Sequence, residues 1–255
     1  MTIPVSKAIR DYDKRYQTAF RSPGGAGFVG SHLCDLLLSE GHRATRLDNL
    51  ATGRELNIQH LFGNPDFNYT FQDIRYTVDL EGPVDFIYHL ASPASPKHYR
   101  EMPFLTLDTG SKGTQNALDA ARSFGARYLL ASTSEVCGDP EVHPQVETYW
   151  GHVNSLGPRS VYDEAKRYAE AVSLAYQRER DTDVVLVRIF NTYGSPLSGA
   201  PRVRLERRGV PGGYHPSDPA GLCRVLIFRH SGAASLVPPC RPTPLDTQLQ
   251  ACIYY

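Results

Sequence analysis

Short apolar runs alternate with longer amphipathic runs along residues 24–194 of the chain. Short apolar runs between turn residues predict buried strands, whereas apolar positions that recur every turn of a helix predict helices. The pattern predicts strands over 43–48, 68–74, 85–91, 127–133 and 183–191, and helices over 31–39, 104–124 and 159–180. Because strands that alternate with helices form a parallel, doubly wound sheet, the predicted fold class is α/β and Rossmann-like.

Several polar or small residues stand where the predicted strands end. Asp73, Ala91, Thr133 and Asn191 occupy such positions. Ligands of parallel sheets bind beyond the carboxyl ends of the strands, so we expect these residues to meet at one edge. A cap of the following turn is the alternative role for Asp73.

A glycine-rich turn precedes the first predicted helix. Residues 24–30 read GGAGFVG, which matches both GxGxxG and GxxGxxG, and Asp48 follows at the end of the next predicted strand. Glycines let the backbone approach a pyrophosphate at a helix N-terminus, and a carboxylate in this position accepts ribose hydroxyls. The turn therefore predicts a dinucleotide site, the alternative being an ordinary glycine-rich loop with Asp48 as a turn residue.

Tyr162 and Lys166 lie four residues apart in the predicted helix 159–180, and therefore on one face. A neighbouring ammonium favours a phenolate, so we expect Lys166 to lower the pKa of Tyr162 and make it a proton-transfer group. Thr133 would place a hydroxyl beside this pair. A tyrosine and a lysine one turn apart also occur as a plain amphipathic pair, and that alternative applies to the spacing alone.

Six further motifs accompany the glycine turn and the Tyr162–Lys166 pair. They are HLASPASP (89–96), LASTSE (130–135), DPEVHPQ (139–145), YWGHVN (149–154), YDEAKR (162–167) and RIFNTYG (188–194). Together they resemble the extended short-chain dehydrogenase/reductase family, and within it the UDP-glucuronate decarboxylases, also called UDP-xylose synthases. The resemblance covers residues 24–194. Two departures are Cys137, where the family usually has a Tyr, and Gly110, where it usually has an Asn.

The resemblance implies NAD as a bound cofactor. The residues that it places around NAD are Gly24, Gly27, Phe28, Val29, Gly30, Asp48, Asn49, Gly53, Asp73, Ile74, Leu90, Ala91, Ser92, Thr109, Tyr162 and Lys166. Asp73 and Ile74 would flank the adenine, and Lys166 would also hold the nicotinamide ribose. The resemblance implies a UDP-sugar as substrate and a homodimer built partly from the helix of Tyr162.

The resemblance also implies a reaction, the decarboxylation of UDP-glucuronate to UDP-xylose through a 4-keto sugar. The catalytic residues would be Thr133, Glu135, Tyr162 and Lys166, and the substrate residues Pro93, Ala94, Ser95, Tyr99 and Asn191. Related 4,6-dehydratases carry an Asp-Glu pair after the Thr and 4-epimerases usually carry no acid, so Ser134-Glu135 favours decarboxylation. Epimerase and dehydratase activities remain alternatives, as does a Glu135 that only orients its loop.

The composition is that of a soluble cytoplasmic enzyme. The formal net charge is +0, which argues against a broad nucleic-acid-binding or membrane-binding surface. We expect no spanning helix and no signal peptide, because apolar runs of sufficient length are absent from the sequence. The five cysteines form no CxxC pair, so we expect no metal site.

Two flanking segments fit the resemblance poorly. Residues 15–23 provide a weak strand before the glycine turn, with Pro23 in a position where a backbone donor is expected. Residues 195–255 hold nine of the nineteen prolines and no lysine, a composition that predicts weak structure where a substrate domain would follow. The predicted organisation is an atypical segment 1–23, an NAD-binding domain 24–194 and a tail 195–255. A shifted reading frame, a splice variant or a truncated gene would explain the flanks, and a non-catalytic NAD-binding remnant is the alternative function.

Overall fold

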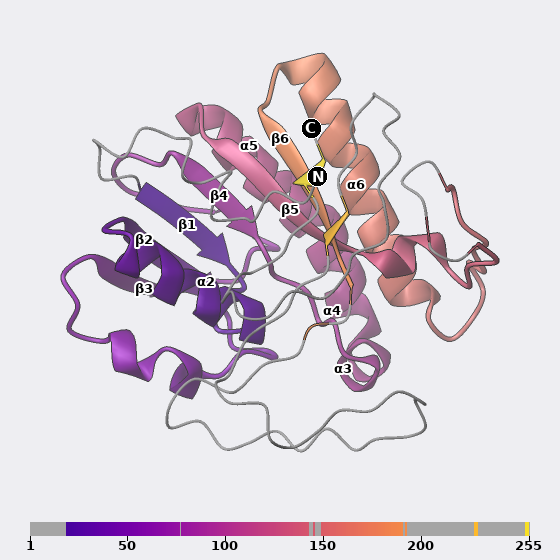
Figure 1. The fold of residues 1–255 in the computed structure, drawn as a ribbon, viewed down its shortest axis with the longest axis horizontal. Helices are drawn as coiled ribbons and strands as arrows, with labels where there is room; N and C mark the ends of the chain where they lie inside the picture. Colours follow the sequence, from indigo (N-terminus) through magenta and orange to yellow (C-terminus); the bar gives the residue numbers. More distant parts are fainter. Residues whose placement is uncertain are drawn as a thin grey trace, which may run out of the picture.

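A largely parallel sheet forms the centre of the computed structural model, which describes residues 19–76, 78–142, 145, 149–190, 192, 227–228 and 253–254 (Figure 1). The order of the six parallel strands is β3-β2-β1-β4-β5-β6. They are β1 Ala19–Pro23, β2 Arg43–Asp48, β3 Phe67–Phe71, β4 Phe86–His89, β5 Arg127–Thr133 and β6 Val184–Ile189. The predicted doubly wound α/β fold is confirmed, and its order reverses between β1 and β4, where such sheets bind ligands.

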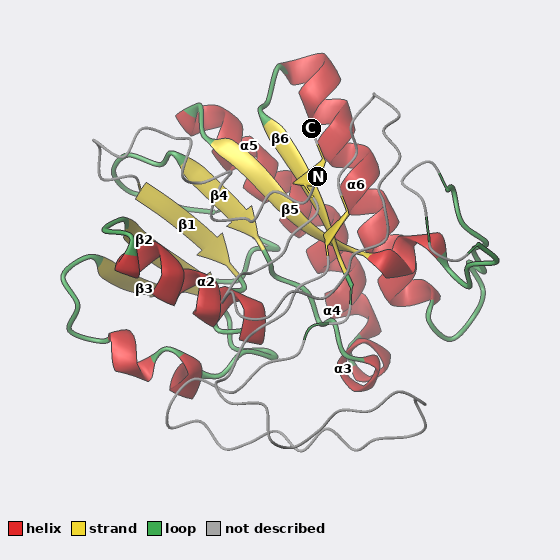
Figure 2. Cartoon of the chain, in the orientation of Figure 1, coloured by secondary structure: helices red, strands yellow, loops and turns green. Residues whose placement is uncertain are grey.

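Helices cover both faces of the sheet (Figure 2). The helix α2 (Phe28–Ser39) packs on one face, and α5 (Thr114–Phe124) and α6 (Ser160–Arg180) pack on the other. The remaining elements are α3 (Pro96–Glu101), α4 (Pro103–Asp108), the π-helical turn η3 (Thr109–Gly113) and the 3₁₀ turns η1 (Glu55–Asn57), η2 (Gln59–Leu61) and η4 (Ser134–Cys137).

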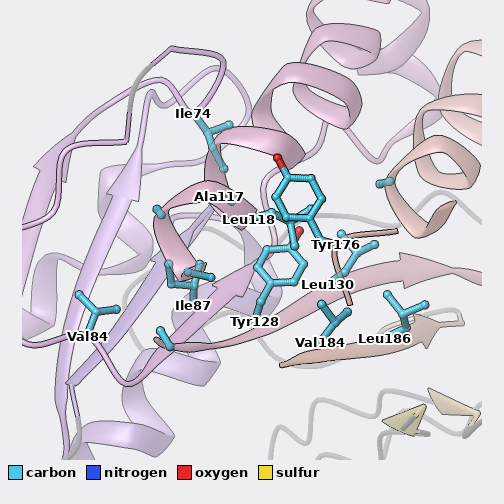
Figure 3. Close-up of a cluster of buried hydrophobic side chains, with 14 residues drawn as sticks. Ile74, Val84, Ile87, Ala117, Leu118, Tyr128, Leu130, Tyr176, Val184 and Leu186 are labelled. Atoms are coloured by element: carbon cyan, nitrogen blue, oxygen red, sulfur yellow. The ribbon is translucent and has the colours of Figure 1, made fainter. Parts of the chain in front are cut away.

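Alternation along the strands divides the core into two apolar layers. In β4, Phe86 and Tyr88 face α2, whereas Ile87 faces α5 and α6. The layer that faces α5 and α6 is the larger one, and Figure 3 shows Tyr128 of β5 and Tyr176 of α6 within it. A strand buried on both faces must be apolar on both, which explains the continuous apolar runs in the sequence.

The strand before the glycine turn forms despite its weak sequence signal. Residues Ala19–Pro23 are all buried in β1 and pair in parallel with β2 and β4. Arg21 fits because its guanidinium reaches out of the sheet and donates to the carbonyl of Glu81 at 2.7 Å. Pro23 is tolerated at the last position, where its carbonyl accepts from the backbone N–H of Leu90 at 2.9 Å. The sequence-based doubt about this strand was therefore wrong.

The predicted helix 104–124 is interrupted at η3, between α4 and α5. At Gly110 a Cβ would lie 2.7 Å from the Cβ of Ala165 and 2.8 Å from its carbonyl oxygen in α6. The two helices approach too closely for any side chain there. The Asn that is usual in the resembling family would therefore not fit at this position without a shift of α6.

The tail contributes two short strands to the same sheet. Ile227–Phe228 (β7) and Ile253–Tyr254 (β8) both pair antiparallel with β6. The rest of the predicted tail 195–255, and residues 1–18, lie outside the described residues.

Candidate active site

A cleft opens at the carboxyl ends of β1, β2, β4 and the segment after β3. Many of the predicted cofactor residues line it, namely Gly24, Gly27, Asp48, Asn49, Gly53, Asp73, Ile74, Leu90, Ala91, Ser92 and Thr109, together with the predicted substrate residue Pro93. Sequence reasoning missed Ala51, Thr52, Gln72, Val78 and Leu105, which also line it. These are loop and helix residues without a motif of their own, so only the fold brings them to the cleft.

The glycine turn brings the backbone into contact with the neighbouring strand. Gly24 has φ +82°, and a Cβ on it would lie 2.5 Å from the backbone nitrogen of Ala91. Gly30 is required for packing within the turn, since a Cβ there would lie 2.4 Å from the Cα of Gly25. Phe28 and Val29 begin α2 behind the cleft, where Phe28 contacts the ring of His32. The turn thus leaves a cleft that added side chains would disturb.

The Asp48 carboxylate is fixed by the backbone on both oxygens. It accepts from the N–H of Ala26 and from that of Leu50, both at 2.8 Å. Behind it, the guanidinium of Arg46 is fully buried, lies 3.6 Å from the carboxylate and stacks on the ring of Tyr69. A carboxylate has further lone pairs, so Asp48 keeps acceptor capacity for ribose hydroxyls at the cleft.

Asp73 follows the neighbouring strand β3 and is held by Arg75 and Asn49. The Arg75 guanidinium approaches both carboxylate oxygens, with its NH2 2.6 Å from Oδ2, and the Asn49 amide donates to the same oxygen at 3.0 Å. These hydrogen bonds outweigh the effect of burial and lower the pKa of Asp73. Asp73 is therefore an anchored anion as well as a residue of the wall.

The predicted acid/base residues meet between β5 and α6. Thr133 lies close enough to Tyr162 to lower its pKa, and Lys166 donates from Nζ to the carbonyl of Ala131 at 2.7 Å. Nζ lies 5.9 Å from the centroid of the Tyr162 ring. Tyr162 is 5% exposed and Lys166 6%, so the phenol and the ammonium share a site from which most water is excluded.

Burial dominates the electrostatics of Tyr162. It raises the pKa of Tyr162, the nearby charge of Glu135 raises it further, and Thr133 opposes both. Burial also lowers the pKa of the Lys166 ammonium to about 8. That Lys166 lowers the pKa of Tyr162 stays a prediction.

Glu135 lies beside Tyr162 in a cluster of charges that includes two residues missed from the sequence. An oxygen of Glu135 lies 2.5 Å from the guanidinium of Arg159, and Asp163 lies on the same side of α6. Arg159 caps the helix and Asp163 follows Tyr162 directly, so helical spacing could have indicated both.

The predicted substrate residues differ from one another in burial and in contacts. Ser95 caps α3 by accepting from the N–H of His98, and Ala94 is exposed. Tyr99 is 1% exposed, and its ring stacks on that of Tyr162 with centroids 5.3 Å apart. Asn191 lies outside the described residues.

The family model that matches this chain is the NAD dependent epimerase/dehydratase family, and the match covers residues 23–206. The chain belongs to that family. The family that the sequence motifs predicted falls within this match. NAD as the cofactor is confirmed, because the matching family is NAD dependent. The residues present fit a dinucleotide, because the glycine turn keeps side chains out of the cleft and Asp48 stands at its wall.

Curated relatives indicate which members of the family this chain is similar to. UDP-glucuronic acid decarboxylase 1 of Danio rerio is 55% identical over 174 residues, covering 68% of this chain and 41% of that protein. UDP-glucuronic acid decarboxylase 4 of Arabidopsis thaliana is 54% identical over 171 residues, covering 67% of this chain and 38% of that protein. The chain therefore spans about two fifths of the length of these relatives.

Solved structures share the fold. A dTDP-glucose 4,6-dehydratase of Streptomyces venezuelae with NAD bound has a TM-score of 0.59 at 28% identity, covering 66% of this chain and 54% of that one. A UDP-galactose 4-epimerase has a TM-score of 0.58 at 30% identity, covering 71% and 58%.

Within the part of the chain that the structure describes, no helix is long and apolar enough to span a bilayer. The same residues contain no group of three or more His, Cys, Asp or Glu side chains arranged to hold a metal ion.

Proposed function

We propose that this protein decarboxylates UDP-glucuronate to UDP-xylose with bound NAD. The observation that carries the proposal is the position of Glu135, an acid whose backbone N–H donates to Thr133 and whose charge acts on Tyr162. The related decarboxylases in the comparisons support the same reaction. Because the match covers only part of their length, the activity of this chain is the point to test.

Bound NAD would supply reversible hydride acceptance from C4 of the glucuronosyl ring. Gly24 and Gly27 would leave room for its pyrophosphate, and Asp48 would accept its adenosine ribose hydroxyls. Lys166 reaches the end of β5 from α6, where an ammonium can donate to the second ribose.

Tyr162 and Thr133 would move the proton of the 4-hydroxyl group, since Thr133 lies close enough to Tyr162 to lower its pKa. The resulting 4-keto sugar has its carboxylate β to a ketone. Carbon dioxide can then leave, because the bond electrons are held as an enolate. A protonated Tyr162 suits this step, since a phenol donates a hydrogen bond to the developing oxyanion.

The decisive experiment incubates the full 255-residue chain with NAD and UDP-glucuronate in D₂O and follows the products by NMR. We expect UDP-xylose with one deuterium at C5 and release of carbon dioxide. Formation of the 4-epimer of UDP-glucuronate instead would contradict the decarboxylase assignment and support an epimerase.

A second candidate function is NAD binding without turnover. It is favoured by the end of the family match at residue 206, which leaves residues 207–255 unassigned to the family. NAD binding together with the absence of any sugar product in the same experiment would support this candidate.

We also propose that the protein forms a homodimer through α4 and α6. The two helices pack together, and Phe104 and Leu107 of α4 and Tyr168 of α6 expose large apolar surfaces. Phe104 is 80% exposed, which is unfavourable in water unless a partner covers it. Sedimentation velocity should show a dimer that Phe104→Glu converts to a monomer. A wild-type protein that sediments as a monomer at micromolar concentration would overturn this proposal.

A further inference from the structure

Asp163 is a buried carboxyl group that the proposed reaction has not used. It lies in the first turn of α6, directly after Tyr162, and is 6% exposed. Among the described residues, no donor reaches its Oδ1 atom. Buried carboxylates are normally satisfied by hydrogen bonds, so this oxygen needs an explanation.

The group that Asp163 faces is another carboxyl group, that of Glu135 in η4. Two ionised carboxylates accept hydrogen bonds and donate none, so they repel each other unless one holds a proton. The cation that opposes the raised pKa of Asp163 is Arg159, whose guanidinium lies 2.5 Å from the Glu135 carboxylate. One positive charge therefore serves two acids.

A second arginine of α6 lies near the pair but is engaged elsewhere, since Arg167 donates to the carbonyl of Val136 at 2.9 Å and lies 3.6 Å from Glu164. Glu164 on the same helix adds a further negative charge near Asp163, and Tyr162 and the buried Tyr99 of α3 are neutral phenols. Burial, followed by the charge of Glu135, raises the pKa of Asp163 to about 6, with Arg159 opposing them. Burial and charge thus favour the same arrangement, one proton between two carboxyl groups.

We propose that Asp163 and Glu135 form a carboxyl pair that holds one shared proton, and that Asp163 is a positioning residue that delivers this proton through Glu135 to C5 of the sugar. The delivery of the proton to C5 rests on the proposed function.

The proton balance of decarboxylation fits this role. The bond from C5 to the carboxylate carbon breaks, its electron pair becomes the enolate, and carbon dioxide leaves. A C–H bond then forms at C5 with the proton of the pair, and the pair recovers one proton from solvent. One proton is consumed in each turnover, and the hydride lost from C4 returns to it.

The shared proton can be tested by thermal or denaturant unfolding between pH 4 and pH 7, without any activity. A carboxyl pKa raised in the folded state means that the native protein binds the proton more tightly than the unfolded chain. Stability is therefore fully present at the lower pH and is lost as pH rises toward about 6.

We expect Asp163→Asn to remove a change on the order of 100-fold in the unfolding equilibrium constant across this pH range. The matched control is Glu164→Gln, the same chemical change on the next residue, whose half-exposed side chain pairs with Arg167. The control should keep most of the wild-type slope, because Glu164 is the weakest of the charges that raise the pKa of Asp163. Parallel curves for the wild type and Asp163→Asn would overturn the shared proton, and if Asp163→Asn fails to fold, Glu135→Gln decides by the same criterion.

The positioning role is tested by the pH profile of UDP-xylose formation. In the wild type, kcat should fall as pH rises through about 6, where the shared proton is lost, and this fall should be absent in Asp163→Asn. A residue that only supports the fold would lower kcat equally at every pH, and that result would overturn the role. Absence of UDP-xylose in the wild type would overturn the proposed function and the role toward C5, while the unfolding curves still decide the pair.

Discussion

The two halves of the carboxyl edge of the sheet are organised by different interactions. Around β1, β2 and β4, the cleft is shaped by backbone contact, as at Gly24 against Ala91. Around β5, η4 and α6, the site is shaped by buried ionisable side chains, among them Lys166 and Asp163. Substitutions in the first half should therefore act through packing and be insensitive to pH, whereas those in the second should act through charge and depend on pH.

The largest effect that this comparison predicts is that of Gly24→Ala. Left-handed backbone costs an alanine about 1–2 kcal/mol, and the collision with Ala91 should add about 1–3 kcal/mol. Gly41→Ala is a matched control, because Gly41 has the same φ of +82° with nothing within 4 Å of its Cβ. Urea unfolding of both variants at two pH values measures the collision as their difference. Equal losses would mean that packing against Ala91 contributes nothing.

Lys166→Met should show the opposite behaviour, a stability difference that changes with pH. Burial lowers the pKa of Lys166 to about 8, so the native protein releases the proton more readily than the unfolded chain. The wild type should gain stability over the variant as pH rises from about 8 to about 10.5, by up to about 3 kcal/mol. Denaturation across that range checks the sign, and a constant difference would contradict the burial of a charged ammonium.

Arg46 is an exception to the comparison, because it is a buried charge in the half of the edge shaped by the backbone. Its guanidinium nitrogens have no hydrogen-bond partner within the described residues and only a 3.6 Å approach to Asp48. Removing one partner of a buried ion pair leaves the other charge uncompensated, so Arg46→Met should lower stability by about 3 kcal/mol. Unchanged stability in calorimetry would show that the two backbone hydrogen bonds to Asp48 suffice without this cation.

The difference between the two halves of the sheet edge also explains how much of each could be predicted from the sequence. Strands β2 and β5 have the predicted bounds, because buried apolar runs mark them, and the glycine turn was recognisable because its spacing reflects backbone geometry. The strand β1 was doubted because residues 15–23 give a weak strand signal and Pro23 removes a backbone donor, and only the tertiary contact with Glu81 explains the burial of Arg21.

Charge interactions across the fold were harder to predict. The raised pKa of Tyr162 depends on its burial and on Glu135, neither of which helical spacing reveals. The contact of Asp163 with Glu135 joins α6 to η4, so it also needed the fold. The helix α3 was missed although Ser95 and Pro96 form a start signal that the sequence contains.

The smallest predicted effect concerns the choice of cofactor in the cleft. The Asp48 carboxylate should accept ribose hydroxyls and repel a 2′-phosphate, so NAD should bind at least about tenfold more tightly than NADP. Calorimetric titrations with both dinucleotides measure the ratio. Equal affinities would show that the ribose does not reach Asp48, or that buried Arg46 neutralises it.

The most direct measurement compares NAD affinity with carbon dioxide release in the wild type, Tyr162→Phe and Tyr176→Phe. Tyr176→Phe is the control, because it removes a hydroxyl group from the same helix. That hydroxyl group donates to Asp119, away from Thr133. We predict that all three bind NAD equally, and that Tyr162→Phe alone lowers carbon dioxide release from UDP-glucuronate by a factor on the order of 100 or more. Undiminished release from Tyr162→Phe would contradict the assignment of this half of the edge to acid/base chemistry.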